Sequence, residues 1–138
     1  MDTDAVADSS VIVALVTPEK ESEWATKKTR EYKYLHLLDL SFYEVANAIT
    51  YKVSSSFGGE DAKAAFKQAQ KIMDLFAVHG FSEVLVEAFN SAPELKISIY
   101  DAAFLALSDR LNCKLVTLDV KLAKKLEKTK YAALIECP

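Results

Sequence analysis

The chain has 138 residues, of which 51% are hydrophobic, and it contains three glycines and three prolines. We therefore expect one compact domain, residues 1–138, that is long enough to bury a sizeable core. The formal net charge of −3 gives no overall attraction to nucleic acid, so such binding would need a local basic patch. No apolar run approaches the ~20 residues of a membrane span, and the first residues lack the basic start of a signal peptide. These features predict a cytoplasmic protein.

The first half of the chain alternates short strands with helices. In chain order the expected elements are a strand at 5–7, a helix from 8 to about 18, an amphipathic helix at 21–33, a strand at 34–40 and a helix at 41–53. Ser41 and Glu44 have the S-x-x-E spacing of a capping box, which predicts a helix start at Ser41. The glycine pair after this helix predicts a turn.

The second half continues the alternation. Its expected elements are a helix at 60–78, a short edge strand at 80–82, a helix at 83–91, a helix at 98–112, a strand at 114–118, a helix from 119 and a strand at 132–136. Ser98 and Asp101 form an S-x-x-D capping box. A strand with a helix on each side, as at 98–126, indicates an α/β fold with parallel strands.

The cysteines and histidines offer little chemistry by their spacing. Cys113 precedes one expected strand and Cys137 follows another, which places them at opposite ends of parallel strands, about 16 Å apart at ~3.3 Å per residue. A disulfide needs Cα atoms within about 7 Å, so we expect free thiols. His36 and His79 are isolated in the sequence, and we expect both to be structural or exposed. No catalytic triad, Cys-His pair or glycine-rich phosphate loop is recognisable.

Four acids are predicted to stand at helix starts: Asp8, Glu44, Asp101 and Asp119. Any one of them alone is most simply a helix cap. Helices that follow parallel strands begin on the same rim of the sheet, however, so the capping interpretation itself gathers Asp8, Glu44 and Asp119. Asp101 joins them if its helix packs across that rim. This rim is where open α/β sheets bind ligands.

Gathered carboxylates require a cation. Two of them about 6 Å apart repel by roughly 3 kcal/mol at an effective dielectric of 20. An all-oxygen site suits Mg²⁺ or Mn²⁺, and such an ion activates water and stabilises charge on a phosphodiester. Small oxygen-bearing side chains that lie beside the acids in sequence are Ser9, Ser10, Asn47 and Thr117.

A group of lysines follows Asp119. Lys121, Lys124 and Lys125 are candidates for contacts with RNA phosphates, which would position RNA without reading its sequence. The alternative is an ordinary solvated helix face.

The sequence resembles the PIN-domain ribonucleases, and among them the VapC-like toxins of VapBC toxin–antitoxin pairs. The resemblance rests on ADSSV around Asp8, EVANA from Glu44, YDAAFLALS from Tyr100 and LVTLDVKL around Asp119. It implies a three-layer α/β/α fold with a central parallel sheet of four to five strands. It also implies that Asp8, Glu44, Asp101 and Asp119 bind metal and cleave RNA, and that the partners are a small antitoxin and a second copy of the chain.

The resemblance also predicts how an antitoxin would act. An arginine inserted among the four acids would displace metal or water, and an amphipathic segment would lie in an apolar groove. The expected groove walls are the helices at 41–53 and 60–78, with Tyr43, Tyr51 and Phe57 exposed. The alternative for these aromatics is a place in the core or on a homodimer surface.

Two other functions remain open at this point. A receiver-type phosphotransfer domain also uses an acidic pocket, but it needs an adjacent pair of acids near the first strand, and Asp8-Ser9 lacks that pair. A non-catalytic interaction module of the same fold would be expected to have lost acids, and all four are present here.

Overall fold

The computed structural model describes residues 3–138, and its centre is a five-stranded sheet with the strand order β3-β2-β1-β4-β5. All four neighbouring pairs are parallel. The strands are β1 (Asp4–Ala7), β2 (Tyr34–Leu38), β3 (Ala77–His79), β4 (Lys114–Val116) and β5 (Ile135–Glu136). The helices are α1 (Ser9–Val16), α2 (Ser22–Thr29), α3 (Leu40–Tyr51), α4 (Gly59–Met73), α5 (Leu85–Leu95), α6 (Ile99–Leu111) and α7 (Val120–Leu126). Two short 3₁₀ turns are η1 (Phe81–Glu83) and η2 (Ala132–Leu134).

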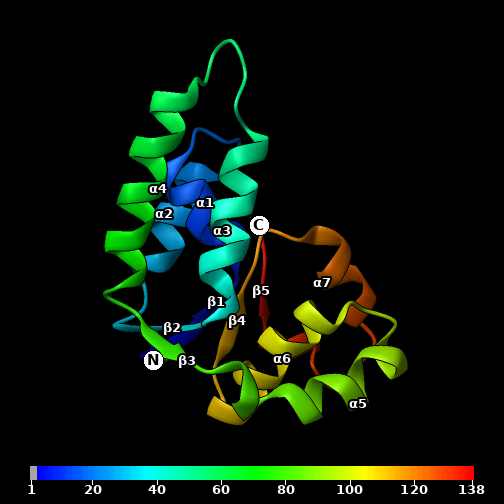
Figure 1. Cartoon of the computed structure of the whole chain (residues 1–138). Helices are drawn as coiled ribbons and strands as arrows, with labels where there is room; N and C mark the ends of the chain where they lie inside the picture. The colour runs from blue at the N-terminus through cyan, green and yellow to red at the C-terminus, as the bar shows by residue number, and fades with distance from the viewer. Residues whose placement is uncertain (1–2) are drawn as a thin grey trace.

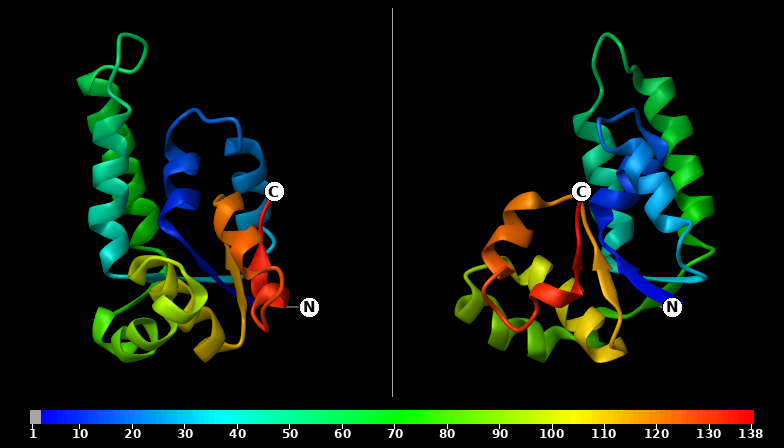
Figure 2. Two further views of the ribbon diagram at one scale, coloured as in Figure 1. Left: turned by 90° about the vertical axis from the view of Figure 1, so that its right-hand side faces the viewer. Right: turned by 180° about the vertical axis from the view of Figure 1, so that it is seen from behind.

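The sheet separates two hydrophobic cores, which confirms the expected three-layer α/β/α fold. Side chains alternate along a strand, so Ala5 and Leu37 face a core closed by α1 to α4. Val6 and Leu38 face the opposite core, closed by α5, α6 and α7. Figure 1 shows these two groups of helices on the two sides of the sheet. In Figure 2 the pair α3 and α4 runs side by side and extends beyond the sheet.

The predicted helix at 60–78 is too long. It ends at Met73, and residues 77–79 form the edge strand β3. The register pairs His36 with Ala77 and Leu38 with His79, so pairing with β2 replaces further helical bonds. Phe76 still packs against the core, from the turn between the two elements, which explains why the apolar period continued past the helix end.

The predicted strand at 80–82 is therefore misplaced, because those residues enter η1. The helix expected at 83–91 lies at Leu85–Leu95. The other elements were predicted in type and order, with ends shifted by a few residues, and the last strand is shortened by η2.

The predicted capping role of Ser41 is wrong, whereas that of Ser98 is correct. The helix α3 begins at Leu40, after Asp39, and Ser41 is fully buried inside it. Its hydroxyl is the one buried side-chain polar atom among the described residues that lacks a hydrogen-bond partner. In contrast, the Ser98 hydroxyl accepts the backbone N–H of Asp101 at 3.0 Å.

The predicted absence of a disulfide is confirmed: Cys113 and Cys137, both among the described residues, are not bridged to each other. His36 and His79, expected to be structural or exposed, lie with their rings in contact and are largely buried, which fits the structural role. Among the helices described for residues 3–138, none is long and apolar enough to cross a membrane.

Candidate active site

The candidate site lies where β1 and β4 end, with Asp8 at its centre. Asp8 directly follows β1 and caps α1: its carboxylate accepts the backbone N–H of Ser10 at 3.0 Å. It also accepts the hydroxyls of Ser10 and Thr117. The side chain is buried, so these donors provide the hydrogen bonds that water would otherwise provide to the carboxylate.

Thr117 joins Asp8 to the second acid of this rim, Asp119. The buried Thr117 hydroxyl donates to Asp8 and accepts the backbone N–H of Asp119 at 3.0 Å. Asp119 in turn caps α7, because its carboxylate accepts the N–H of Leu122 at 3.0 Å. The strand β4 ends at Val116 rather than at Leu118 as predicted, although the Thr117 N–H still bonds to the backbone oxygen of Glu136 at 3.0 Å.

The other two acids come from helices of opposite layers. Glu44 lies on α3 and accepts the hydroxyl of Ser9 at 2.7 Å. It occupies the second turn of its helix, so the prediction that it marks a helix start is wrong. Asp101 lies in the first turn of α6, as predicted.

Electrostatics show that the four acids are close enough to influence one another. Burial raises the pKa of Asp8 to about 6, the Ser10 and Thr117 hydrogen bonds oppose this, and the charge of Asp101 adds to it. Burial also raises the pKa of Glu44, with the Asp101 charge contributing. The pKa of Asp101 is raised by burial and then by the charge of Asp119. The cluster therefore resists full ionisation.

The donor set fits a hydrated divalent cation better than an enclosed one. Among residues 3–138, no three carboxylate, imidazole or thiol groups converge into a ready-made metal cage. Mg²⁺ seldom uses such cages: it keeps several waters and takes one or two carboxylates together with substrate phosphates. The four carboxylates are partly buried, repel one another and have hydroxyl neighbours. An ion of this kind would relieve the repulsion between them.

The predicted supporting residues divide into two groups. Ser9, Ser10 and Thr117 each bond directly to one of the acids. Asn47 lies one turn after Glu44 on α3 with its side chain exposed.

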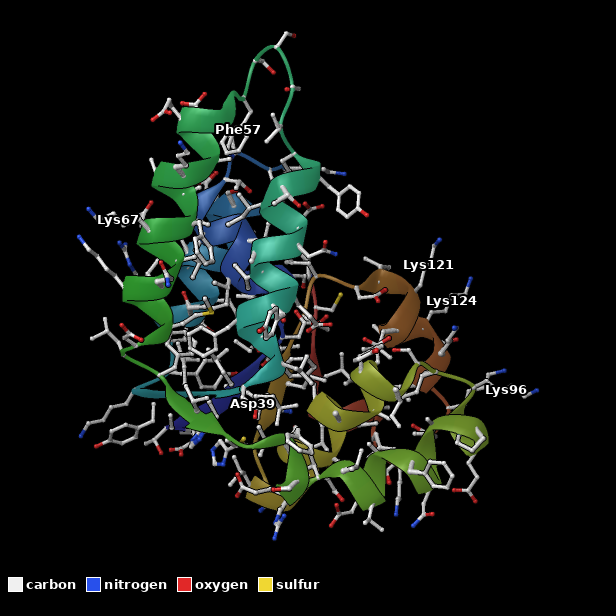
Figure 3. The ribbon with its side chains drawn as sticks, viewed as in Figure 1. Asp39, Phe57, Lys67, Lys96, Lys121 and Lys124 are labelled. Carbon is white, nitrogen blue, oxygen red and sulfur yellow. The ribbon has the colours of Figure 1, made fainter. Side chains whose placement is uncertain are left out.

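The predicted basic residues lie on α7, and one of them, Lys125, is close enough to Asp101 to affect it. The charge of Lys125 lowers the pKa of Asp101 and so acts against the carboxylate repulsion. Lys121, Lys124 and Lys125 line a shallow surface hollow together with Glu127 and Lys128. Figure 3 shows Lys121 and Lys124 extending from the outer side of α7.

Two features of the site were missed from the sequence. Cys137 lies near it, because the charges of Asp119 and Asp8, after burial, raise the pKa of its thiol. A groove of about 310 Å³ runs from Glu44 and Ser9 along Ala48 to Lys52, which pairs with Glu19 at 2.7 Å. The sequence contains a pattern that indicates this groove, because Glu44, Ala48 and Lys52 are spaced four residues apart and therefore share one helix face.

The raised pKa of Asp8 predicts an unusual pH dependence in metal-free protein. The folded state holds this proton more tightly than the unfolded state, whose reference value is 3.8. The contribution of Asp8 to stability therefore increases as pH falls through about 6, by about 1 kcal/mol between pH 7 and 5. Urea unfolding in EDTA at both pH values measures it. Asp8→Asn should lose this gain; an equal pH response in both proteins would contradict the assignment.

The comparisons with known proteins agree with this geometry. The sequence matches the PIN domain over residues 5–128. It is 38% identical over 121 residues to Ribonuclease VapC3 of Pyrobaculum aerophilum, covering 87% of this chain and 92% of that protein. The crystal structure of PAE2754 from Pyrobaculum aerophilum superimposes with a TM-score of 0.67 at 27% identity, covering 96% and 89% of the two chains. A toxin–antitoxin complex from Klebsiella pneumoniae shares the fold, with a TM-score of 0.69 at 13% identity and coverage of 96% and 95%.

Proposed function

The chain belongs to the PIN-domain family, and on that premise we propose that it is a divalent-metal-dependent endoribonuclease, the toxin of a toxin–antitoxin pair. The 38% identity to Ribonuclease VapC3 supports the activity. The observation that carries the mechanism is the mutual influence of the charges on Asp8, Glu44, Asp101 and Asp119. The family match leaves no support for the receiver-domain alternative.

The proposed roles follow from the position of each side chain. Mg²⁺ or Mn²⁺ would be held by the four acids Asp8, Glu44, Asp101 and Asp119, and when bound it supplies an activated water and stabilises charge on the phosphodiester. The hydroxyls of Ser10 and Thr117 hold the Asp8 carboxylate in one orientation.

Glu44 is the fourth acid of the proposed metal site. Its pKa is raised by burial, and Ser9 fixes one of its oxygens. It is therefore suited to take a proton from the attacking water as the water oxygen bonds to phosphorus, while the phosphorus–oxygen bond to the leaving ribose oxygen breaks and that oxygen takes a proton from solvent.

The lysines of α7 are proposed to bind RNA phosphates beside this site. Replacing Lys121 and Lys124 by Ala should raise KM for RNA at moderate salt with little change in kcat. The slope of log affinity against log salt should become shallower by about 0.7 per lost contact. The matched control is the Lys63→Ala, Lys67→Ala pair on α4, which should change neither quantity. Equal effects of the two pairs would contradict a local phosphate site.

An antitoxin partner is proposed to close the same site. The name of the Klebsiella pneumoniae neighbour, a toxin–antitoxin complex, supports a partner of this kind. Tyr43 and Tyr51 are exposed on α3, as predicted, at 85% and 83%. The prediction for Phe57 is wrong: it is partly buried against the core beside α4. A partner arginine directed at the acids and an amphipathic segment along α3 would exclude RNA.

Co-expression tests this proposal as a whole. The chain, expressed alone in the cytoplasm, where we propose it acts, should arrest growth and degrade RNA. Expressed with the product of a neighbouring small reading frame, it should be harmless and should co-purify as a complex, in which we expect a homodimer of this chain. Harmless expression alone, together with no cleavage by the purified chain, would contradict the toxin and nuclease assignments.

A further inference from the structure

The groove between α1 and α3 leads from the proposed metal site to an ion pair that the proposed mechanism does not use. Ser9 and Glu44 line the end of the groove at the metal site. Lys52, which directly follows α3, lies at its other end together with Glu19, from the connection between α1 and α2. Lys52 Nζ is 2.7 Å from Glu19 Oε2.

The connection after α1 holds Glu19 in place. The Ser22 hydroxyl accepts the backbone N–H of Glu19 at 2.9 Å and donates to the backbone oxygen of Thr17 at 2.9 Å. The buried Thr17 hydroxyl lies 3.3 Å from the same Glu19 oxygen that pairs with Lys52. The side chains of Lys52 and Glu19 are 32% and 20% exposed. The pair is therefore oriented by its surroundings and only partly solvated.

Both members of the pair retain the capacity to form hydrogen bonds. A lysine ammonium has three N–H donors, and among residues 3–138 the Lys52 ammonium has no partner except the Glu19 carboxylate. The second oxygen of that carboxylate, Oε1, has no partner in the same part of the chain. The ion pair thus presents hydrogen-bond donors next to an acceptor at the end of the groove.

The lining of the groove suits a nucleobase better than a phosphate. Glu44 and Glu19 lie at its two ends, so a phosphate inside it would be repelled by a carboxylate at either end. The charge of Lys52 is already balanced by Glu19. Between the ends, Val13 and Ala48 provide an apolar lining. A nucleobase has apolar faces and a polar edge, and proteins bind unpaired bases by packing against the faces and hydrogen-bonding the edge.

The size of the groove fits one base next to the metal site. Glu44 and Lys52 are eight residues apart in the sequence, which corresponds to a rise of about 12 Å along a helix. The volume of about 310 Å³ is at the lower end of the range for ligand sites, about 300 to 1,000 Å³. The groove therefore has room for the base of one nucleotide whose phosphate lies at the metal, and not for several.

We propose that the groove binds the base of a nucleotide adjoining the scissile phosphate, and that Glu19 and Lys52 make the enzyme prefer guanine or uracil at that position. This inference rests on the proposed nuclease function and specifies the RNA that the same site selects. Guanine and uracil carry a carbonyl oxygen next to a ring N–H on their pairing edge. The Lys52 ammonium can donate to this oxygen, and the Glu19 carboxylate can accept this N–H.

Adenine and cytosine are disfavoured at both atoms. Their pairing edge carries an amino group next to a ring nitrogen that has a lone pair. The Lys52 donors would then face the amino donor, and the Glu19 carboxylate would face the lone pair, so neither hydrogen bond forms. Contacts of two hydrogen bonds to a base edge discriminate between bases by roughly tenfold to a hundredfold. Because the pair is partly solvated, we expect a preference of about tenfold.

Cleavage of a random-sequence, unstructured RNA pool by the purified chain in Mg²⁺ tests this inference. Sequencing the product ends gives the base frequencies beside the cut, and competing substrates are used in proportion to kcat/KM. At one of the two positions that adjoin the cut, we expect guanine and uracil to exceed adenine and cytosine by about tenfold relative to the uncut pool.

Variants of the pair should change this base ratio. Glu19→Gln keeps the size of the side chain, but its amide can donate as well as accept, so the ratio should fall at least threefold. Lys52→Met removes the donors and should lower the ratio similarly, whereas Lys52→Arg keeps the charge and donors and should retain the preference. The matched control is Lys28→Met on α2, which removes a part-buried lysine that pairs with Glu31 at 2.9 Å outside the groove. It should leave the ratio unchanged.

The total cleavage and the base ratio separate the possible results. If the pair only holds the connection after α1 against α3, Glu19→Gln and Lys52→Met will lower cleavage of all sequences equally and leave the ratio unchanged, which overturns the inference. An unchanged ratio together with weaker binding of the antitoxin also overturns it and assigns the groove to that protein. Cleavage by the unaltered chain without the base preference rejects this inference alone. If the unaltered chain cleaves no RNA, the proposed function fails, and this inference fails with it.

Discussion

RNA cleavage by this protein is expected to stop when EDTA removes divalent metal, and to resume when Mg²⁺ or Mn²⁺ is restored in excess. The reason is the composition of the proposed centre, which has four carboxylates and three hydroxyl neighbours. Burial raises the pKa of three of the carboxylates, Asp8, Glu44 and Asp101. The two histidines are hydrogen-bonded to each other, and His36 is hydrogen-bonded to Asp4. Water activation by this site therefore needs the ion.

Single-turnover cleavage of a labelled RNA, with and without chelator, measures this effect. Circular dichroism in EDTA serves as the control, because the fold of the metal-free protein should persist. Metal should also raise the unfolding temperature in proportion to the logarithm of its concentration above Kd. Cleavage that continues in EDTA would contradict the metal mechanism while leaving the family assignment intact.

Asp101→Asn is expected to reduce RNA cleavage by roughly 10²-fold or more, the range in which loss of a reacting or charge-stabilising group falls. Asn keeps the size of the side chain but removes its charge. Because burial and the Asp119 charge raise the pKa of Asp101, its ionised form costs free energy at pH 7. The stability of the metal-free variant should therefore equal or exceed that of the original.

The matched control is Asp109→Asn, at an exposed position two turns along the same helix α6, which should retain full activity. A second comparison separates site from scaffold. Ser98 provides the cap of α6, so Ser98→Ala should lower stability by about 1 kcal/mol and spare much of the activity. If Asp101→Asn instead loses stability and keeps cleavage, Asp101 is a helix-start residue only.

Local sequence patterns determined most of the secondary structure of this protein and the helix caps at its candidate site. Asp8 and Asp119 cap their helices through bonds to N–H groups two and three residues away, and Ser98 does the same. Such contacts depend on neighbours in the chain, so spacing alone predicts them. The parallel sheet followed from strands alternating with helices, because crossover connections leave few other arrangements.

Only the tertiary structure decided the features that depend on residues distant in sequence. The apolar period of α4 continues past Met73, but pairing of Ala77–His79 with β2 ends the helix. Ser41 has the spacing of a cap, yet the helix begins one residue earlier and Ser41 lies fully buried inside α3. The Ser9–Glu44 and Thr117–Asp8 bonds span 35 and 109 residues, and the histidine contact spans 43. These contacts form through strand order and register, which set the neighbours of each side chain regardless of its position along the chain.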